Sequence, residues 1–126
     1  MNKANILKLA AYIESLPPGK YDQRISWKPC GSPSCIAGHA TFLAGQKIPI
    51  GLQRERSTCE AASKWLGIKE PESSALFTEE PYYGDGNRTP TPQDAAWTLR
   101  HLAETSSVVW RPKGKPQRQP ISHDQG

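Results

Sequence analysis

Three cysteines and one of the histidines are the side chains of this chain best suited to metal binding or nucleophilic chemistry. Cys30, Cys35 and His39 lie within ten residues, and Cys59 could act as a fourth ligand. Thiolate and imidazole groups are the usual ligands of tetrahedral zinc. However, the first two cysteines are five positions apart across Pro33, unlike the compact Cys-x-x-Cys spacing of zinc knuckles. Because free cysteine is often buried as a small apolar side chain, we interpret these residues as packed thiols and predict neither a metal site nor a cofactor.

The same segment would also allow a nucleophilic cysteine–histidine pair. Cys35 lies near the start of a predicted helix, where a thiol pKa is lowered, and His39 follows one turn later on the same face. Such a pair needs a third group to orient the imidazole, and no asparagine or aspartate lies nearby in the sequence. We therefore predict no catalytic residue and expect the protein not to be an enzyme. A thiol- or zinc-dependent enzyme is the least favoured hypothesis.

The spacing of apolar residues and the turn signals predict the helices that position this segment. Five helices are expected: after Asn2 to Leu16, from Pro33 or Ser34 to Leu43, after Ser57 to Leu66, from Pro71 to Phe77, and after Thr91 to Ala103. The clearest start is the last one, where Thr91 is an N-cap residue and Pro92 occupies the first helical position. Ser57 and Glu60 have the spacing of a capping box for the third helix.

The core is expected where these helices place their apolar stripes. The stripes comprise Ile6, Leu9, Ala10, Ile13, Leu16, Ile36, Ala40, Leu43, Ala61, Ala62, Trp65, Leu66, Ala95, Leu99, Leu102 and Ala103. Tyr21, Ile25 and Trp27 alternate as in a short extended segment packed on this core, and residues 108–110 are expected to close it. The fold class is mostly α: a compact bundle of about five short helices with long Pro- and Gly-rich loops and a disordered C-terminal tail.

The charge divides the chain into a near-neutral domain, residues 1–110, and a basic, Pro-rich tail, residues 111–126. Of the 126 residues, those in the tail contribute four cations and one anion, +3 of the net +4, which leaves +1 for the domain. A basic tail favours nucleic acid much less than a basic folded surface does. The sequence has no apolar run of about 18 residues that would span a membrane and does not begin like a signal peptide. The odd number of cysteines argues against a complete set of disulfides. Together these features favour a cytoplasmic location, where thiols stay reduced.

Two groups of residues are candidates for binding a partner. Tyr82 and Tyr83 follow a proline in a polar loop, and tyrosine is enriched at protein interfaces, although one of the two could instead fold back onto the core. Arg111, Lys113 and Lys115 begin the tail, where they could contact a partner or phosphates. No aromatic residue alternates with these cations, so base stacking is not indicated.

Several segments together resemble a family of short uncharacterised proteins of bacteriophages and bacterial genomes. These segments are the cysteine–glycine turn and small-residue helix at 30–40, the Leu-Phe segment at 75–77, the helix start at 91–96, and the Leu-Arg-His-Leu-Ala-Glu stretch at 99–104 that leads to Val-Val-Trp at 108–110. The resemblance covers about residues 3–110. It departs from the family at Ser32-Pro33 and in the additional tail, and His39 is not reliably a histidine in that pattern.

The resemblance implies a phage or prophage origin and no particular activity. Our first hypothesis is a non-enzymatic accessory protein that binds and modulates a host protein, such as a defence or transcription component, in the host cytoplasm. The alternative is a nucleic-acid-binding module that uses the basic tail with the cations of the first helix and of residues 53–56. The oligomeric state is left open.

Overall fold

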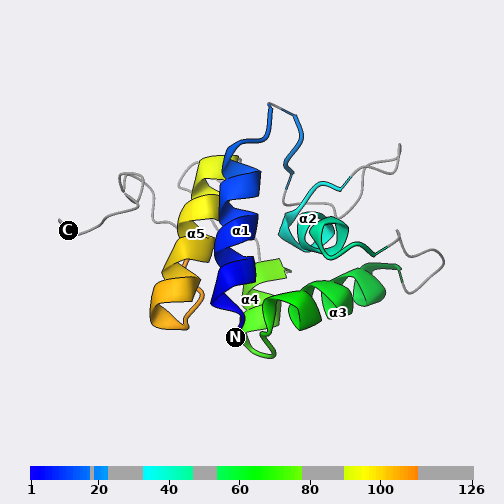
Figure 1. Ribbon diagram of the computed structural model, residues 1–126, viewed down its shortest axis with the longest axis vertical. Helices are drawn as coiled ribbons and strands as arrows, with labels where there is room; N and C mark the ends of the chain where they lie inside the picture. Colours follow the sequence, from blue (N-terminus) through cyan, green and yellow to red (C-terminus); the bar gives the residue numbers. More distant parts are fainter. Residues whose placement is uncertain (18, 23–32, 47–53, 78–89, 111–126) are drawn as a thin grey trace.

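The computed structural model describes residues 1–17, 19–22, 33–46, 54–77 and 90–110. These residues form five helices, namely α1 (Lys3–Glu14), α2 (Ile36–Leu43), α3 (Arg54–Leu66), α4 (Glu72–Phe77) and α5 (Pro92–Thr105) (Figure 1). The prediction of a mostly α fold with about five short helices is therefore confirmed. The tail lies outside the described residues, so its predicted disorder and the domain boundary at residue 110 stay predictions.

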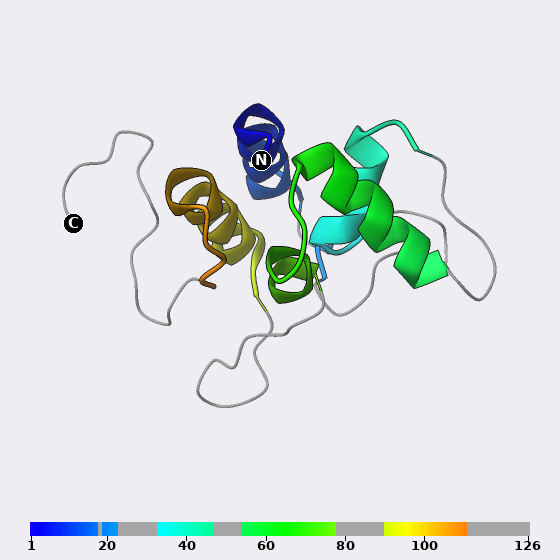
Figure 2. The ribbon, with the colours of Figure 1, turned by 90° about the horizontal axis from the view of Figure 1, so that it is seen from below.

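Helix α1 occupies the centre of the arrangement. Helix α5 runs antiparallel along one side of α1, and α2 lies on the other side (Figure 1). Helix α3 packs mainly against α2, and the short α4 touches both of these helices, as the view from below shows (Figure 2). Contacts of α1 with α2, α3 and α5 make it the element that links the two halves of the core.

Side-chain capping fixes the starts of α1 and α5 as predicted. The Asn2 carboxamide accepts a hydrogen bond of 3.0 Å from the Asn5 backbone N–H. At α5, the Thr91 hydroxyl accepts from the Asp94 N–H at 3.1 Å, and the Asp94 carboxylate accepts from the Thr91 N–H at 2.9 Å. This reciprocal capping box satisfies two backbone N–H groups and explains why a carboxylate lies buried at the first turn.

The starts of α2 and α3 differ from the prediction. Helix α2 begins at Ile36, with Cys35 as an N-cap residue in an extended conformation that makes no side-chain capping bond. In the described residues α3 begins at Arg54, so Ser57 lies inside the helix and the predicted capping box is wrong. The buried Thr58 hydroxyl donates to the Arg54 carbonyl at 2.7 Å, so the helical turn before the predicted start is formed, and Thr58 lies on the same face as Ala62. Packing, which stabilises most helices in proteins, outweighs a local capping signal here.

The predicted core is largely confirmed. Its fully buried members include Ile6, Leu9, Ala10, Ile13, Ile36, Ala40, Ala62, Leu66, Ala95, Leu99 and Leu102, and the structure adds Leu76 of α4 to them. Leu16, Leu43 and Trp65 are only partly buried against this cluster, and the predicted core residue Ala61 is also only partly buried. Tyr21 is buried as expected, whereas Ile25 and Trp27 lie outside the described residues.

Residues 108–110 close the core only in part. Val108 and Trp110 pack against the core cluster, and the Trp110 indole N–H donates to the Ala75 carbonyl at 3.0 Å. Val109, in contrast, is 45% exposed. Among the last described residues, Trp110 is thus bonded to α4, and Val108 packs on the core cluster.

Helix α2 is buried around most of its circumference, and not along a single stripe. Every residue from Ile36 to Thr41 is buried, because α1, α3 and α4 all contact this helix. The Thr41 hydroxyl donates to the Ala37 carbonyl at 2.8 Å and lies 3.1 Å from the Thr58 carbonyl of α3. A buried hydroxyl is thereby satisfied where α2 and α3 meet.

Candidate functional site

Of the segment with potential metal-binding or nucleophilic residues, the described part that holds Cys35 and His39 lies inside the core. Cys35 is 3% exposed and His39 is 2% exposed. The His39 Nε2 atom lies 2.9 Å from the Lys20 carbonyl oxygen, which can only accept, so Nε2 carries a proton and donates it. The Tyr12 ring of α1 contacts the imidazole edge to face, with ring centroids 5.6 Å apart and an interplanar angle of 61°. The histidine therefore has a structural role between α1, α2 and the loop after α1.

Burial determines the protonation of His39. Desolvation disfavours the charged imidazolium and lowers the pKa of His39 below 6.5, although hydrogen bonds to the backbone of Lys20 and Ser34 act in the opposite direction. At neutral pH the imidazole is therefore uncharged, a form that packs in an apolar core at lower cost than the cation.

Cys59 on α3 is half-buried against the core cluster. Burial raises the pKa of the Cys59 thiol to about 11, with smaller contributions from Cys35 and from Glu55, Glu70 and Glu60. The reactive form of cysteine is the thiolate. Cys59 is thus a protonated, weakly nucleophilic thiol at neutral pH.

The set of residues considered for zinc is only partly described. Cys30 lies outside the described residues, while Cys35 is packed in the core cluster. Among the residues that the structure describes, no three His, Cys, Asp or Glu side chains are grouped so that they could hold a metal ion. The described part of the set agrees with packed side chains.

A pair of aromatic side chains at the surface packs next to His39 through the ring of Tyr12. The rings of Tyr12 on α1 and Phe42 on α2 are stacked, with centroids 6.5 Å apart and an interplanar angle of 29°. Tyr12 is half-buried, whereas Phe42 is 52% exposed, the largest exposed fraction among the large hydrophobic side chains in the described ranges. We call this pair the aromatic patch. An exposed aromatic ring held against a second ring is suited to docking another molecule because it offers apolar area with little side-chain freedom to lose.

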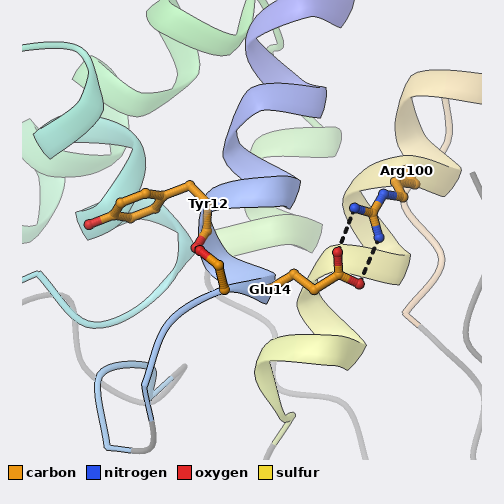
Figure 3. A network of polar contacts seen from close by, with 4 residues as sticks. Tyr12, Glu14 and Arg100 are labelled. Carbon is orange, nitrogen blue, oxygen red and sulfur yellow. Dashed lines mark hydrogen bonds and ion pairs between the residues drawn. The ribbon is translucent and has the colours of Figure 1, made fainter.

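Helix α1 is fixed in the orientation that presents Tyr12 to α2. Tyr12 and Glu14 leave α1 on opposite sides, Tyr12 toward α2 and Glu14 toward α5 (Figure 3). The Glu14 carboxylate accepts two hydrogen bonds from the Arg100 guanidinium, at 2.7 and 3.0 Å. The pair is only partly exposed, and two parallel bonds restrict both side chains, so it fixes the end of α1 more firmly than an exposed ion pair would.

Phe42 is not among the predicted partner-binding residues, although its position in the sequence carries a signal. At about 100° per residue, position 42 lies well away from the stripe formed by Ile36, Ala40 and Leu43. An aromatic side chain off the buried stripe of a helix is a candidate for surface contacts. The predicted partner-binding residues Tyr82, Tyr83, Arg111, Lys113 and Lys115 lie outside the described residues and stay predictions, as does the nucleic-acid alternative that rests on the tail.

No protein-family model matches this chain, and neither a curated protein nor a solved structure was found to match it. The resemblance to short phage and bacterial proteins therefore stays a prediction from the residues quoted above. Within the described ranges, every helix is too short or too polar to cross a bilayer.

The lowered pKa of His39 predicts a loss of stability on acidification. Because the unfolded chain binds a proton at this site near pH 6.5 and the folded protein does so only at lower pH, the contribution of His39 is complete above pH 6.5. It decreases as the pH falls from 6.5 toward the lowered folded-state pKa, with a slope of at most about 1.4 kcal/mol per pH unit. His39→Gln keeps an N–H donor toward the Lys20 carbonyl and removes the titration. Urea unfolding between pH 5 and 7.5 should show a steeper decrease for the wild type, and parallel curves for the two proteins would contradict the prediction.

Proposed function

We propose that this protein acts by binding another protein and not by catalysing a reaction, with the aromatic patch as its contact surface. The exposed Phe42 ring, stacked on Tyr12, is the single observation that carries this proposal. The aromatic patch joins two helices that are far apart in the sequence, so its shape depends on the folded state. Phenylalanine and tyrosine in this arrangement resemble the aromatic anchors that dominate protein–protein binding energies.

The state of the described cysteines and of His39 supports a binding role. Cys35 and His39 are almost inaccessible, and the pKa of Cys59 is raised to about 11. A nucleophile needs both access to substrate and an activated form. None of these three side chains combines the two.

For the partner, we propose a host protein such as a defence or transcription component, with this protein as a phage or prophage accessory factor that modulates it. The resemblance of residues 3–110 to short phage and bacterial proteins motivates this part of the proposal. An accessory protein of this kind needs only a stable domain and a contact surface, which a single helical domain supplies.

A comparison of two exposed positions tests whether the aromatic patch binds a protein. Phe42→Ser removes the exposed ring on α2. The control, Leu7→Ser, changes an apolar side chain on α1 that is outside the aromatic patch and has a similar exposed fraction, 46%. In pull-downs from bacterial lysate, we expect a protein that is recovered with the wild type and with Leu7→Ser but is reduced at least tenfold with Phe42→Ser. Thermal melts should show that both variants remain folded. Recovery of the same proteins by all three baits, or by none, would contradict the proposal.

A further inference from the structure

We propose that the aromatic patch binds an acidic segment of its partner that carries an aromatic or large aliphatic anchor residue. This inference rests on the proposed function and specifies the chemistry of the partner at that surface. Its two parts, the anchor and the negative charge, follow from different observations and can fail separately.

The anchor follows from the geometry of the two rings. Phe42 stacks on Tyr12, and Tyr12 in turn contacts the buried imidazole of His39, so the exposed ring rests on a layer of packed rings. An apolar side chain placed against Phe42 removes apolar area from water on both partners. Because the patch is packed from beneath, little conformational freedom remains to be lost on binding.

The negative charge of the partner follows from two exposed lysines whose backbone positions adjoin the aromatic patch. Lys8 is exposed and lies one turn before Tyr12 on the same face of α1. Lys20 is also exposed, and its backbone carbonyl accepts the hydrogen bond from His39 beneath the patch. Lys8 thus precedes Tyr12 in the sequence and Lys20 follows it. The backbone of Lys20 and the ring of Tyr12 contact the same histidine.

The nearby acidic residues do not cancel this charge. The Glu14 carboxylate is directed to the opposite side of α1, where the Arg100 guanidinium neutralises it (Figure 3). Asp22, two residues after Lys20, is half-buried. Its backbone N–H donates to the Ser34 carbonyl, and its carbonyl accepts from the Ser34 hydroxyl, just before the start of α2. Accordingly, of the charged residues that the structure describes between positions 8 and 22, the two exposed ones are both lysines.

Charge also decides between the possible occupants of the patch. A second copy of the chain would bring the same lysines against Lys8 and Lys20, and like charges in contact are unfavourable. The chain's own tail carries a net charge of +3 and would be repelled for the same reason. An acidic segment of a different protein satisfies both the rings and the lysines.

Selection from a random library of displayed 12-residue peptides against the full-length protein tests the inference. We expect the enriched peptides to combine Trp, Phe, Tyr or Leu with flanking Asp and Glu. The double variant Lys8→Glu, Lys20→Glu should bind the enriched acidic peptides about tenfold more weakly at low salt, with a smaller difference at 0.5 M salt because exposed charges are screened. Phe42→Ser should also weaken these peptides at least tenfold, whereas Leu7→Ser should leave the affinity unchanged.

Each contrary result has a distinct meaning. Enrichment of neutral or basic peptides whose binding still requires Phe42 would overturn the acidic chemistry and leave the proposed function intact. Binding that is indifferent to Phe42→Ser would overturn the aromatic patch as the contact surface altogether. The proposal would also be overturned if no peptide were enriched. A second measurement is sedimentation with vesicles of phosphatidylcholine and phosphatidylserine in equal parts. If the protein sediments with them and this requires Phe42, the patch binds an anionic membrane instead of an acidic protein segment.

Discussion

Leu99→Ala is expected to lower the free energy of unfolding by about 3–5 kcal/mol. Leu99 is fully buried on α5, the helix that packs along α1, and belongs to the central core cluster. The substitution removes three carbon atoms from a site where helices on both sides are fixed, so the space cannot close by a small movement of one side chain. Because domains of this size are usually stable by only about 5–15 kcal/mol, the loss should be visible as a large decrease in the urea midpoint.

The matched control is the same substitution at an exposed leucine. Leu7 is 46% exposed on α1, so Leu7→Ala should change the free energy of unfolding by no more than about 0.5 kcal/mol. Both variants can be measured by urea unfolding followed by far-ultraviolet circular dichroism. Equal midpoints for Leu99→Ala and Leu7→Ala would show that the α1–α5 interface is not the centre of the core.

Elements specified by neighbouring residues were predictable from the sequence. The start of α5 is an example, because Thr91, Pro92 and Asp94 lie within one turn and every bond of the capping box is local. The start of α3 was predicted wrongly from an equally local pattern, since Ser57 and Glu60 have capping-box spacing but lie inside the helix. There the deciding contacts are with α2, and contacts between two separate helices are not encoded by the spacing of residues within one of them.

The candidate site was less predictable for the same reason. The apolar surroundings of Cys35 and His39 correctly indicated burial, because nearly every residue of their helix is small or apolar. Phe42 belongs to that helix too, and the periodicity alone does not say which side of α2 the other helices leave uncovered. The pairing of Phe42 with Tyr12 joins residues that are thirty positions apart, which no local pattern encodes.

Helix α1 connects the stability of the domain with its proposed function. At its beginning, Asn2 and Asn5 donate to the carbonyls of the last turn of α3, and at its end Glu14 is bonded to Arg100 of α5. Tyr12 lies between these attachments. A surface whose supporting helix is held at both ends keeps its shape before binding, which reduces the entropy lost on association.

Gly67→Ala is expected to lower the free energy of unfolding by about 3–5 kcal/mol, more than Gly45→Ala. Gly67 follows the last residue of α3 with a φ of +70°, a conformation that disfavours residues with a Cβ atom. In addition, a Cβ atom at this position would lie 2.8 Å from the backbone nitrogen of Asn2 and 3.2 Å from Met1 backbone atoms. The backbone of Asn2 cannot move away freely, because its N–H donates to the Leu66 carbonyl at 2.8 Å.

Gly45→Ala separates the conformational cost from the steric cost. Gly45 follows the end of α2 with a similar φ of +80°, but nothing lies within 4 Å of its added Cβ atom. Gly45→Ala should therefore lower the free energy of unfolding by only about 1–2 kcal/mol, the cost of the left-handed conformation. The additional loss in Gly67→Ala measures the steric contact between the end of α3 and the residues before α1. Hydrogen exchange gives a local readout, since the Asn2 amide should exchange faster in Gly67→Ala and unchanged in Gly45→Ala. Equal unfolding free energies for the two variants, with the Asn2 amide still protected, would mean that the N-terminal residues do not pack against the end of α3.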